Sequence, residues 1–172
     1  SGSGRPQAAP AQGGPLRAGF FASGRRAAPR RGCRDNPAMQ VFRGLHHALL
    51  ADGGPSAVTV GNFDGVHRGH QAMLALLKSE AQHRGLVSTV LSFEPHPRDF
   101  FAARAGQPDK APARIATLRD KLAELARCGI ERVVVLRFDQ AFADQSPQAF
   151  IDDVLLRGLG ARYVLVGDDF CF

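Results

Sequence analysis

The sequence predicts an α/β fold with a doubly wound parallel sheet. Apolar, β-branched runs alternate with amphipathic helical patterns between residues 57 and 166, in the order strand, helix, strand, helix, strand, helix, strand. Turns rich in glycine, proline or acidic residues follow these strand-like runs. Such an alternation builds a parallel sheet with right-handed connections and helices on both faces. At 172 residues, one folded domain is expected.

The first half of the pattern contains two strands and one helix. Residues 57–60 are apolar and β-branched, as in a strand buried on both faces. A helix is predicted over 71–83, ending at a basic turn and Gly85. Its apolar stripe consists of Met73, Leu74, Leu76 and Leu77. The second strand, 86–93, ends at Glu94-Pro95-His96-Pro97, which is predicted to continue neither a sheet nor a helix.

The second half opens with a polar loop, residues 104–114, long enough to act as a lid or substrate loop. Thr117 is predicted to cap a helix, and a strand follows at 132–138. The inner side of that helix carries Leu118, Leu122, Leu125 and Ala126. Ser146-Pro147, a cap followed by proline, starts another helix. Its inward-facing residues are expected to be Phe150, Ile151, Val154 and Leu155. The last strand, 163–166, leads into residues 167–172.

The basic charge of the chain lies in residues 1–38, which hold seven arginines and one acidic residue. The remainder holds 15 basic and 15 acidic residues, so its formal charge is zero. Because residues 1–38 are rich in Gly, Pro, Ala and Arg without aliphatic periodicity, they are predicted to be a disordered extension. The folded domain is expected to run from 39 to 172, and no specific nucleic-acid partner is expected.

Composition also bears on the compartment. Three sparse cysteines without paired spacing suit a reduced cytoplasm. The sequence has no run of 18 apolar residues, so no membrane span is predicted. The first residues also lack the apolar region of a secretory signal. The sequence carries no signal for an oligomeric state.

The chemistry is expected at residues 61–70, which read GNFDGVHRGH. They lie between a strand end and a helix start, where α/β sheets hold phosphates. Gly61 and Gly65 are predicted to allow backbone angles that a Cβ would forbid, and Gly69 to keep the helix start open to ligand. His67 and His70 lie three residues apart, so they share a face of the first helical turn and can both donate to phosphate oxygens.

Simpler interpretations exist for each of these residues. Two histidines three apart are, as a bare pattern, more often solvated or half-buried polar residues than a site. A zinc site would need cysteine or histidine ligands at finger-like spacing, and the sequence places none nearby. His96, between two prolines, is more often a structural loop residue than a catalyst. At least one of Phe100 and Phe101 is expected to belong to the core.

The whole stretch is more specific than its histidines. A strand, two glycines, Asp64 and H-x-G-H at a helix start resemble the HxGH nucleotidyltransferase superfamily, which has a Rossmann-like sheet. The longer form G-x-F-D-G-x-H-x-G-H resembles the adenylyltransferase domain of bacterial bifunctional riboflavin kinase/FAD synthetases. This resemblance covers about residues 39–172 and stops before a later motif and the kinase barrel of that family. The domain is therefore expected to be incomplete at its C-terminus and to have little or no activity by itself.

The resemblance implies transfer of AMP from ATP to FMN, giving FAD and pyrophosphate, with Mg²⁺ accompanying ATP and no metal-ligating residue assigned. His67 and His70 would be catalytic. The implied ATP-binding residues are Gly61, Asn62, Phe63, Asp64, Gly65 and Gly69. The implied flavin-binding residues are Pro95, His96, Pro97, Phe101, Phe150, Asp169 and Phe172. Cys171 stands where an arginine is common in that family.

Two alternatives stay open. Another HxGH nucleotidyltransferase could use phosphopantetheine or nicotinamide mononucleotide as the acceptor. A nucleotide- or flavin-binding module without activity is the second alternative. In each case three stretches that follow strand ends, GNFDGVHRGH, EPHP and GDDFCF, are expected to converge on one cleft.

Overall fold

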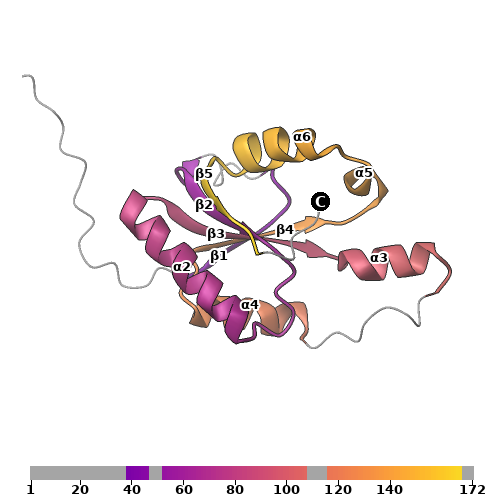
Figure 1. Cartoon of the computed structure of the whole chain (residues 1–172), viewed down its shortest axis with the longest axis horizontal. Coiled ribbons are helices and arrows are strands. Elements are labelled where there is room, and N and C mark those ends of the chain that lie inside the picture. The colour runs from indigo at the N-terminus through magenta and orange to yellow at the C-terminus, as the bar shows by residue number, and fades with distance from the viewer. Residues whose placement is uncertain (1–37, 47–51, 108–115, 168–172) are drawn as a thin grey trace, which may run out of the picture. The chain divides into compact units, whose positions relative to one another are not determined.

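The computed structural model describes residues 38–46, 52–107 and 116–167. Predictions made for residues 1–37, for most of the 104–114 loop, and for Asp169, Cys171 and Phe172 lie outside these ranges. The described part contains a five-stranded sheet in which all neighbouring strands are parallel, in the order β1-β4-β3-β2-β5 (Figure 1). The strands are β1 (Gln40–Arg43), β2 (Ser56–Val60), β3 (Val87–Glu94), β4 (Arg132–Arg137) and β5 (Ala161–Leu165).

Helices cover both faces of the sheet, which confirms the predicted fold class. The helical segments are α2 (Arg68–Arg84), α3 (Pro97–Arg104), α4 (Leu118–Arg127), α5 (Gln140–Ala143), α6 (Pro147–Ala149) and the π-helix η2 (Phe150–Gly158). Figure 1 shows α2 and α4 on one face and the segment of α6 on the other, with α3 extending beyond the end of β3. None of the helices in the described ranges is long and apolar enough to cross a membrane.

Each face has its own core. Leu74 and Leu77 of α2 and Leu125 of α4 are fully buried against one face of the sheet. Phe150 and Val154 of η2 are buried against the other face. All five residues of β2 are buried, as predicted for a strand covered on both sides. The sheet is thus a middle layer between two cores.

Three helix boundaries follow from local residues, as the sequence predicted. The Thr117 side chain accepts from the Asp120 amide, and the Asp120 carboxylate accepts in return from the Thr117 amide, which is a capping box. The Ser146 hydroxyl accepts from the Ala149 amide at the start of α6. Gly85 ends α2 with a left-handed φ of 67°.

Two elements were not predicted, and two side chains were placed on the wrong side. The strand β1 was not predicted, and neither was α3, which begins at Pro97 after the break that Pro95 and His96 make at the end of β3. Pro97 fits there because the first helical position needs no backbone donor. Leu76 and Ile151, both expected to face inward, are 49% and 42% exposed.

The order of the strands sets where the site lies. The chain passes from β2 to β3 to β4 and then returns to place β5 on the other side of β2. A ligand of such a sheet binds where the strand order reverses, beyond the carboxyl ends. Here that position is the end of β2, where residues 61–67 begin. Near the opposite end of α2, the Arg84 guanidinium lies 4.7 Å from the ring centre of Tyr163 in β5.

Candidate active site

The turn after β2 is held in an uncommon backbone conformation. Phe63 and Val66 have φ values of 51° and 27°, although both are buried and neither is glycine. Such angles cost free energy and persist only where the surroundings fix them, as at binding sites. Gly65, at φ 74°, has the left-handed conformation predicted for it. Gly61 does not have a left-handed φ, so the prediction for it was wrong. A Cβ at this position would lie 3.0 Å from the Phe63 ring, so the glycine leaves space for that ring.

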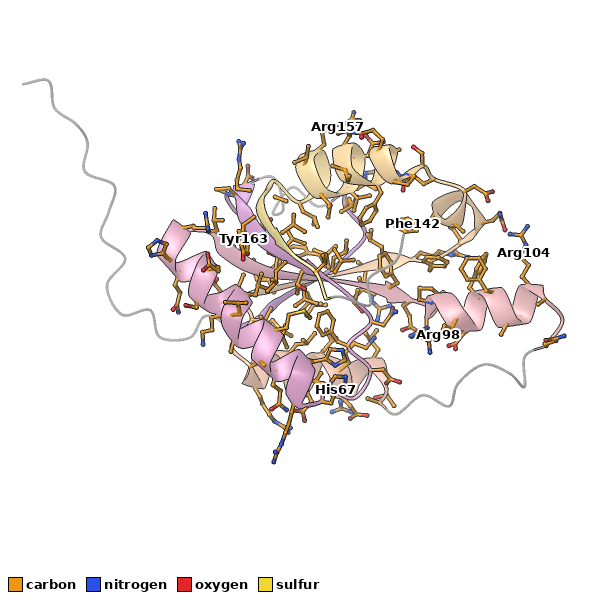
Figure 2. All side chains as sticks on the ribbon, viewed as in Figure 1. His67, Arg98, Arg104, Phe142, Arg157 and Tyr163 are labelled. Atoms are coloured by element: carbon orange, nitrogen blue, oxygen red, sulfur yellow. The ribbon has the colours of Figure 1, made fainter. Side chains whose placement is uncertain are left out.

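His67 is the N-cap of α2, at its exposed N-terminal end (Figure 2). Its Nδ1 accepts from the backbone amide of His70 at 3.4 Å. An imidazole nitrogen that accepts cannot donate at the same time, so in this arrangement Nε2 is the nitrogen of His67 that can donate to a ligand. The side chain therefore has one nitrogen committed to the helix and one donor for a ligand.

His70 lies directly beside His67. The two rings stack with centroids 3.8 Å apart and an interplanar angle of 23°, and Phe63 lies 5.1 Å from His70 on another side. Burial lowers the pKa of His70, and the neighbouring His67 lowers it further against an opposing effect of Asp64. The Nδ1 atom of His70 is buried without a hydrogen-bond partner. Both imidazoles thus come together, as the sequence spacing predicted.

The first turn of α2 has the features of an anion-binding site. It contains no acidic residue, so no side chain there competes with a bound anion. The free amides of a helix start and the helix dipole attract negative charge. A Cβ on Gly69 would lie 3.2 Å from Cε1 of His67, so glycine leaves room for that imidazole.

Two polar contacts connect the turn to α4. Oδ1 of Asp64 accepts from the Ala116 amide at 3.0 Å, immediately before the α4 cap. On the other side, Nζ of Lys121 lies 3.4 Å from Oγ of Ser92, whose hydroxyl lies 3.5 Å from the Asn62 carbonyl oxygen. Oδ1 of Asn62 is buried without a hydrogen-bond partner. The turn is thus braced by a neighbouring strand and a helix.

The Glu94–Pro97 segment follows the end of β3. His96 is the N-cap of α3, and its Nδ1 accepts from the Arg98 amide at 3.0 Å. Burial lowers the pKa of His96; Lys121 and Arg98 lower it further, while Asp99 and Asp64 raise it. Since Nδ1 of His96 accepts this bond, Nε2 is the nitrogen left to donate. Its capping contact agrees with the structural interpretation of this residue.

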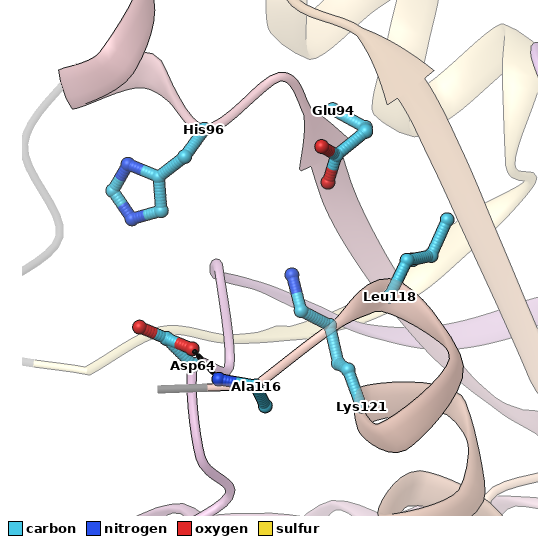
Figure 3. A pocket seen from close by; sticks show the side chains of 6 residues that line it. All are labelled: Asp64, Glu94, His96, Ala116, Leu118 and Lys121. Atoms are coloured by element: carbon cyan, nitrogen blue, oxygen red, sulfur yellow. Dashed lines mark hydrogen bonds between the residues drawn. The ribbon is translucent and has the colours of Figure 1, made fainter. Parts of the chain in front are cut away.

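A narrow recess separates this segment from the turn (Figure 3). Its lining consists of Asp64, Glu94, His96, Ala116, Leu118 and Lys121. The recess has a volume of about 10 Å³, room for about one water molecule. A larger pocket of about 620 Å³ adjoins it at Glu94 and Leu118 and extends to Arg43 and Arg137. The two predicted stretches GNFDGVHRGH and EPHP thus converge, and of the third only Gly167 is described.

Aromatic rings gather beside the end of β3. Phe138 is in edge contact with Phe93, Phe100 and Phe101, at centroid distances of 5.4 to 5.8 Å. Neither Phe100 nor Phe101 is buried, so the expectation that one belongs to the core was wrong; Phe101 is 50% exposed. Phe150, a predicted flavin contact, is 3% exposed and packs against Phe142 in the core below η2.

The sequence reasoning missed Lys121, Ser92 and the role of Glu94 at this site. Lys121 is 6% exposed although it is charged. Its position carried a signal, because 118, 121, 122 and 125 follow the spacing of one helix face and the other three are leucines. A lysine on an otherwise apolar helix face indicates a buried charge that serves a site. Within the described ranges, no three His, Cys, Asp or Glu side chains group as metal ligands.

Comparison with known proteins agrees with this geometry. The family model of FAD synthetase matches residues 51–172. The bifunctional riboflavin kinase/FMN adenylyltransferases of Escherichia coli K12 and Pseudomonas fluorescens are each 46% identical over 134 residues, and that of Haemophilus influenzae is 42% identical. The alignments cover 78% of this chain but 41 to 42% of those relatives.

The crystal structure of a macrolide-efflux protein from Streptococcus pneumoniae has a similar fold. The TM-score is 0.62 at 23% identity, over 78% of this chain and 44% of that chain. At that identity the likeness concerns the fold alone. The family-model match extends over more than half of the sequence and includes the turn with its two histidines, and the chain therefore belongs to the FAD synthetase family.

Proposed function

We propose that this chain is the adenylyltransferase part of a bifunctional riboflavin kinase/FMN adenylyltransferase and transfers AMP from ATP to FMN. The products would be FAD and pyrophosphate. The observation that carries the proposal is the stacked pair of imidazoles at the start of α2, where amides and dipole favour phosphate. The names of the relatives supply the acceptor, because each is called an FMN adenylyltransferase.

The reaction is a displacement at the α-phosphorus of ATP. An oxygen of the FMN phosphate forms the new P–O bond while the bond to pyrophosphate breaks, so no covalent enzyme intermediate is needed. Nε2 of His67 and of His70 would donate to the phosphate oxygens on which negative charge develops. The turn formed by Gly61, Asn62, Phe63 and Asp64 would fix the position of ATP against them, with Gly65 and Gly69 leaving the required room.

Mg²⁺ would reach the site with ATP. Asp64 is the acidic side chain of the turn, and its Oδ1 already accepts from the Ala116 amide. We therefore assign the ion to phosphate oxygens and water rather than to a protein ligand set. When bound, it would neutralise charge on the leaving pyrophosphate.

The flavin would lie beside the end of β3. Pro95, His96 and Pro97 would form a stiff wall, and the half-exposed Phe101 offers an aromatic face. The adjoining pocket of about 620 Å³ is in the size range of small-molecule sites. Asp169 and Phe172 remain proposed contacts, whereas Phe150 is buried in the core and is not proposed as one. A cytoplasmic location and the absence of a nucleic-acid partner belong to the same proposal.

The test is a product assay on a protein of the relatives' full length, because this chain covers only 41 to 42% of them. Incubation with ATP, Mg²⁺ and FMN should release pyrophosphate and form FAD, detected by chromatography. Phosphopantetheine and nicotinamide mononucleotide in place of FMN should give no product. Product from either of these acceptors, with none from FMN, would replace the proposal by another nucleotidyltransferase. Binding of FMN and ATP without any product would leave a binding module.

A further inference from the structure

The recess between the turn and the Glu94–Pro97 segment is not accounted for by ATP phosphates or by flavin rings. It lies on the β3 side of the turn, and Lys121 enters it from α4. Figure 3 shows the Lys121 ammonium directed into the space between Asp64, Glu94 and His96. Burying a lysine to 6% exposure is costly and needs polar partners. The recess therefore brings two carboxylates, an imidazole and an ammonium group together.

The lining combines donors and acceptors. Asp64 and Glu94 contribute carboxylates, Lys121 contributes an ammonium, and His96 contributes Nε2–H because its Nδ1 accepts from Arg98. A phosphate would face two carboxylates here and be repelled. A hydroxyl group both donates and accepts, so it suits neighbours of both kinds.

The size of the recess also favours a hydroxyl group. A volume of about 10 Å³ holds one hydroxyl group but neither a fused ring system nor a phosphate. Asp64, Glu94 and Lys121 already have interactions within the protein. An ammonium has three donor hydrogens and a carboxylate about four acceptor positions, so a ligand hydroxyl can join such a network.

We propose that this recess binds a hydroxyl group of the ribityl chain of the flavin, with Lys121 as the donor and Glu94 or Asp64 as the acceptor. The proposal rests on the proposed function. The recess would then be a separate subsite for the ribityl chain, because it lies between the ATP turn and the segment proposed to bind the flavin ring. Lys121 thereby becomes a residue that selects for a polyol acceptor.

Flavins that share the ring system but differ in the ribityl chain or its phosphate test this proposal directly. Fluorescence titration would use FMN, riboflavin, which lacks the phosphate, and lumiflavin, which lacks the whole chain. Lys121→Met should weaken FMN and riboflavin binding by roughly tenfold or more, as expected for losing a hydrogen bond to a charged group, and leave lumiflavin unchanged. Lys78→Met is the matched control, since Lys78 lies on α2 outside the recess, and it should change none of the three.

Each other pattern overturns the inference. Weaker binding of FMN alone would show that Lys121 contacts the phosphate. Equal weakening of all three flavins would show a ring contact or a general loss of structure, and no change would show that Lys121 does not contact the flavin. If Lys121→Met does not fold, Lys121→Gln, a shorter side chain without the ammonium group, should give the same pattern. Wild-type protein that binds FMN and forms FAD separates a failure of this inference from a failure of the proposed function.

Discussion

The imidazole rings of His67 and His70 stack 3.8 Å apart, and the nitrogen of one accepts from the backbone amide of the other. Two cationic rings at this distance would repel each other, and protonation of Nδ1 on His67 would end its capping contact. In the proposed mechanism each ring therefore keeps one nitrogen available to donate to phosphate. His67 thus has two proposed roles, capping the helix and donating to a ligand, which substitutions can separate.

Replacement of His67 should separate helix capping from catalysis. His67→Asn keeps a good N-cap but removes the Nε2 donor, so kcat/KM should fall by roughly tenfold to a thousandfold with little loss of stability. His67→Ala removes both, and should also lower the free energy of unfolding by about 0.5 to 2 kcal/mol. His70→Ala should lower kcat/KM within the same range. Urea unfolding and steady-state FAD formation measure the two effects; unchanged turnover in His67→Asn would remove that donor from the mechanism.

Gly69→Ala should affect the site more than the fold. The added Cβ would lie 3.2 Å from the His67 ring and displace it. Alanine is a better helix former than glycine by up to about 1 kcal/mol, so stability should not fall. The expected result is a higher KM for ATP at an unchanged or raised midpoint of thermal unfolding. Gly65→Ala is the contrasting variant: its φ of 74° should make the same methyl group destabilising.

Stability should fall on mild acidification. The pKa values of His70 and His96 are lowered in the fold, mainly by burial, so between their folded values and about 6.5 the unfolded chain binds more protons. The stabilisation is fully present above about pH 6.5 and is lost as pH falls through the folded pKa values. His96→Asn, which retains a capping side chain, should flatten the dependence of the unfolding midpoint on pH. His83→Asn, at an exposed position in α2, should leave the wild-type slope, and an identical slope in all three proteins would contradict the assignment.

The capping box of α4 should contribute measurably. Thr117→Ala removes the acceptor for the Asp120 amide and should lower the free energy of unfolding by about 1 kcal/mol. Thr117→Ser should retain most of it. Because Ala116, next to the cap, donates to Asp64, the alanine variant should also raise KM for ATP. A variant with wild-type KM and lowered stability would show that the cap does not position the turn.

Much of the fold could be predicted because its signals are local. The two caps at Thr117 and Ser146, the glycine at 85 and the buried run of β2 each depend on a few neighbouring residues. The strand β1 could not be recognised in the same way, since four residues, QVFR, pair with β4 across nearly a hundred positions. The helix α3 was missed because prolines at 95 and 97 suggested a break, whereas a proline at the first helical position is favourable.

The site was predictable to the extent that its residues are adjacent in sequence. The spacing of His67 and His70 predicted their shared face, and the strand ends predicted that Asp64 and His96 would meet. The position of Lys121 depends on how α4 packs against the turn, which no local pattern states. The burial of Phe150 likewise depends on which face of η2 meets the sheet.

The contact between Arg84 and Tyr163 makes the fluorescence of Tyr163 a reporter of structural change. The chain has one tyrosine and no tryptophan, so its near-ultraviolet emission has a single dominant source. That source lies under a guanidinium at the junction of α2 and β5, the two elements that flank the strand-order reversal. A change in phenol emission when nucleotide is added would therefore report movement of the helix that carries both histidines, without any label.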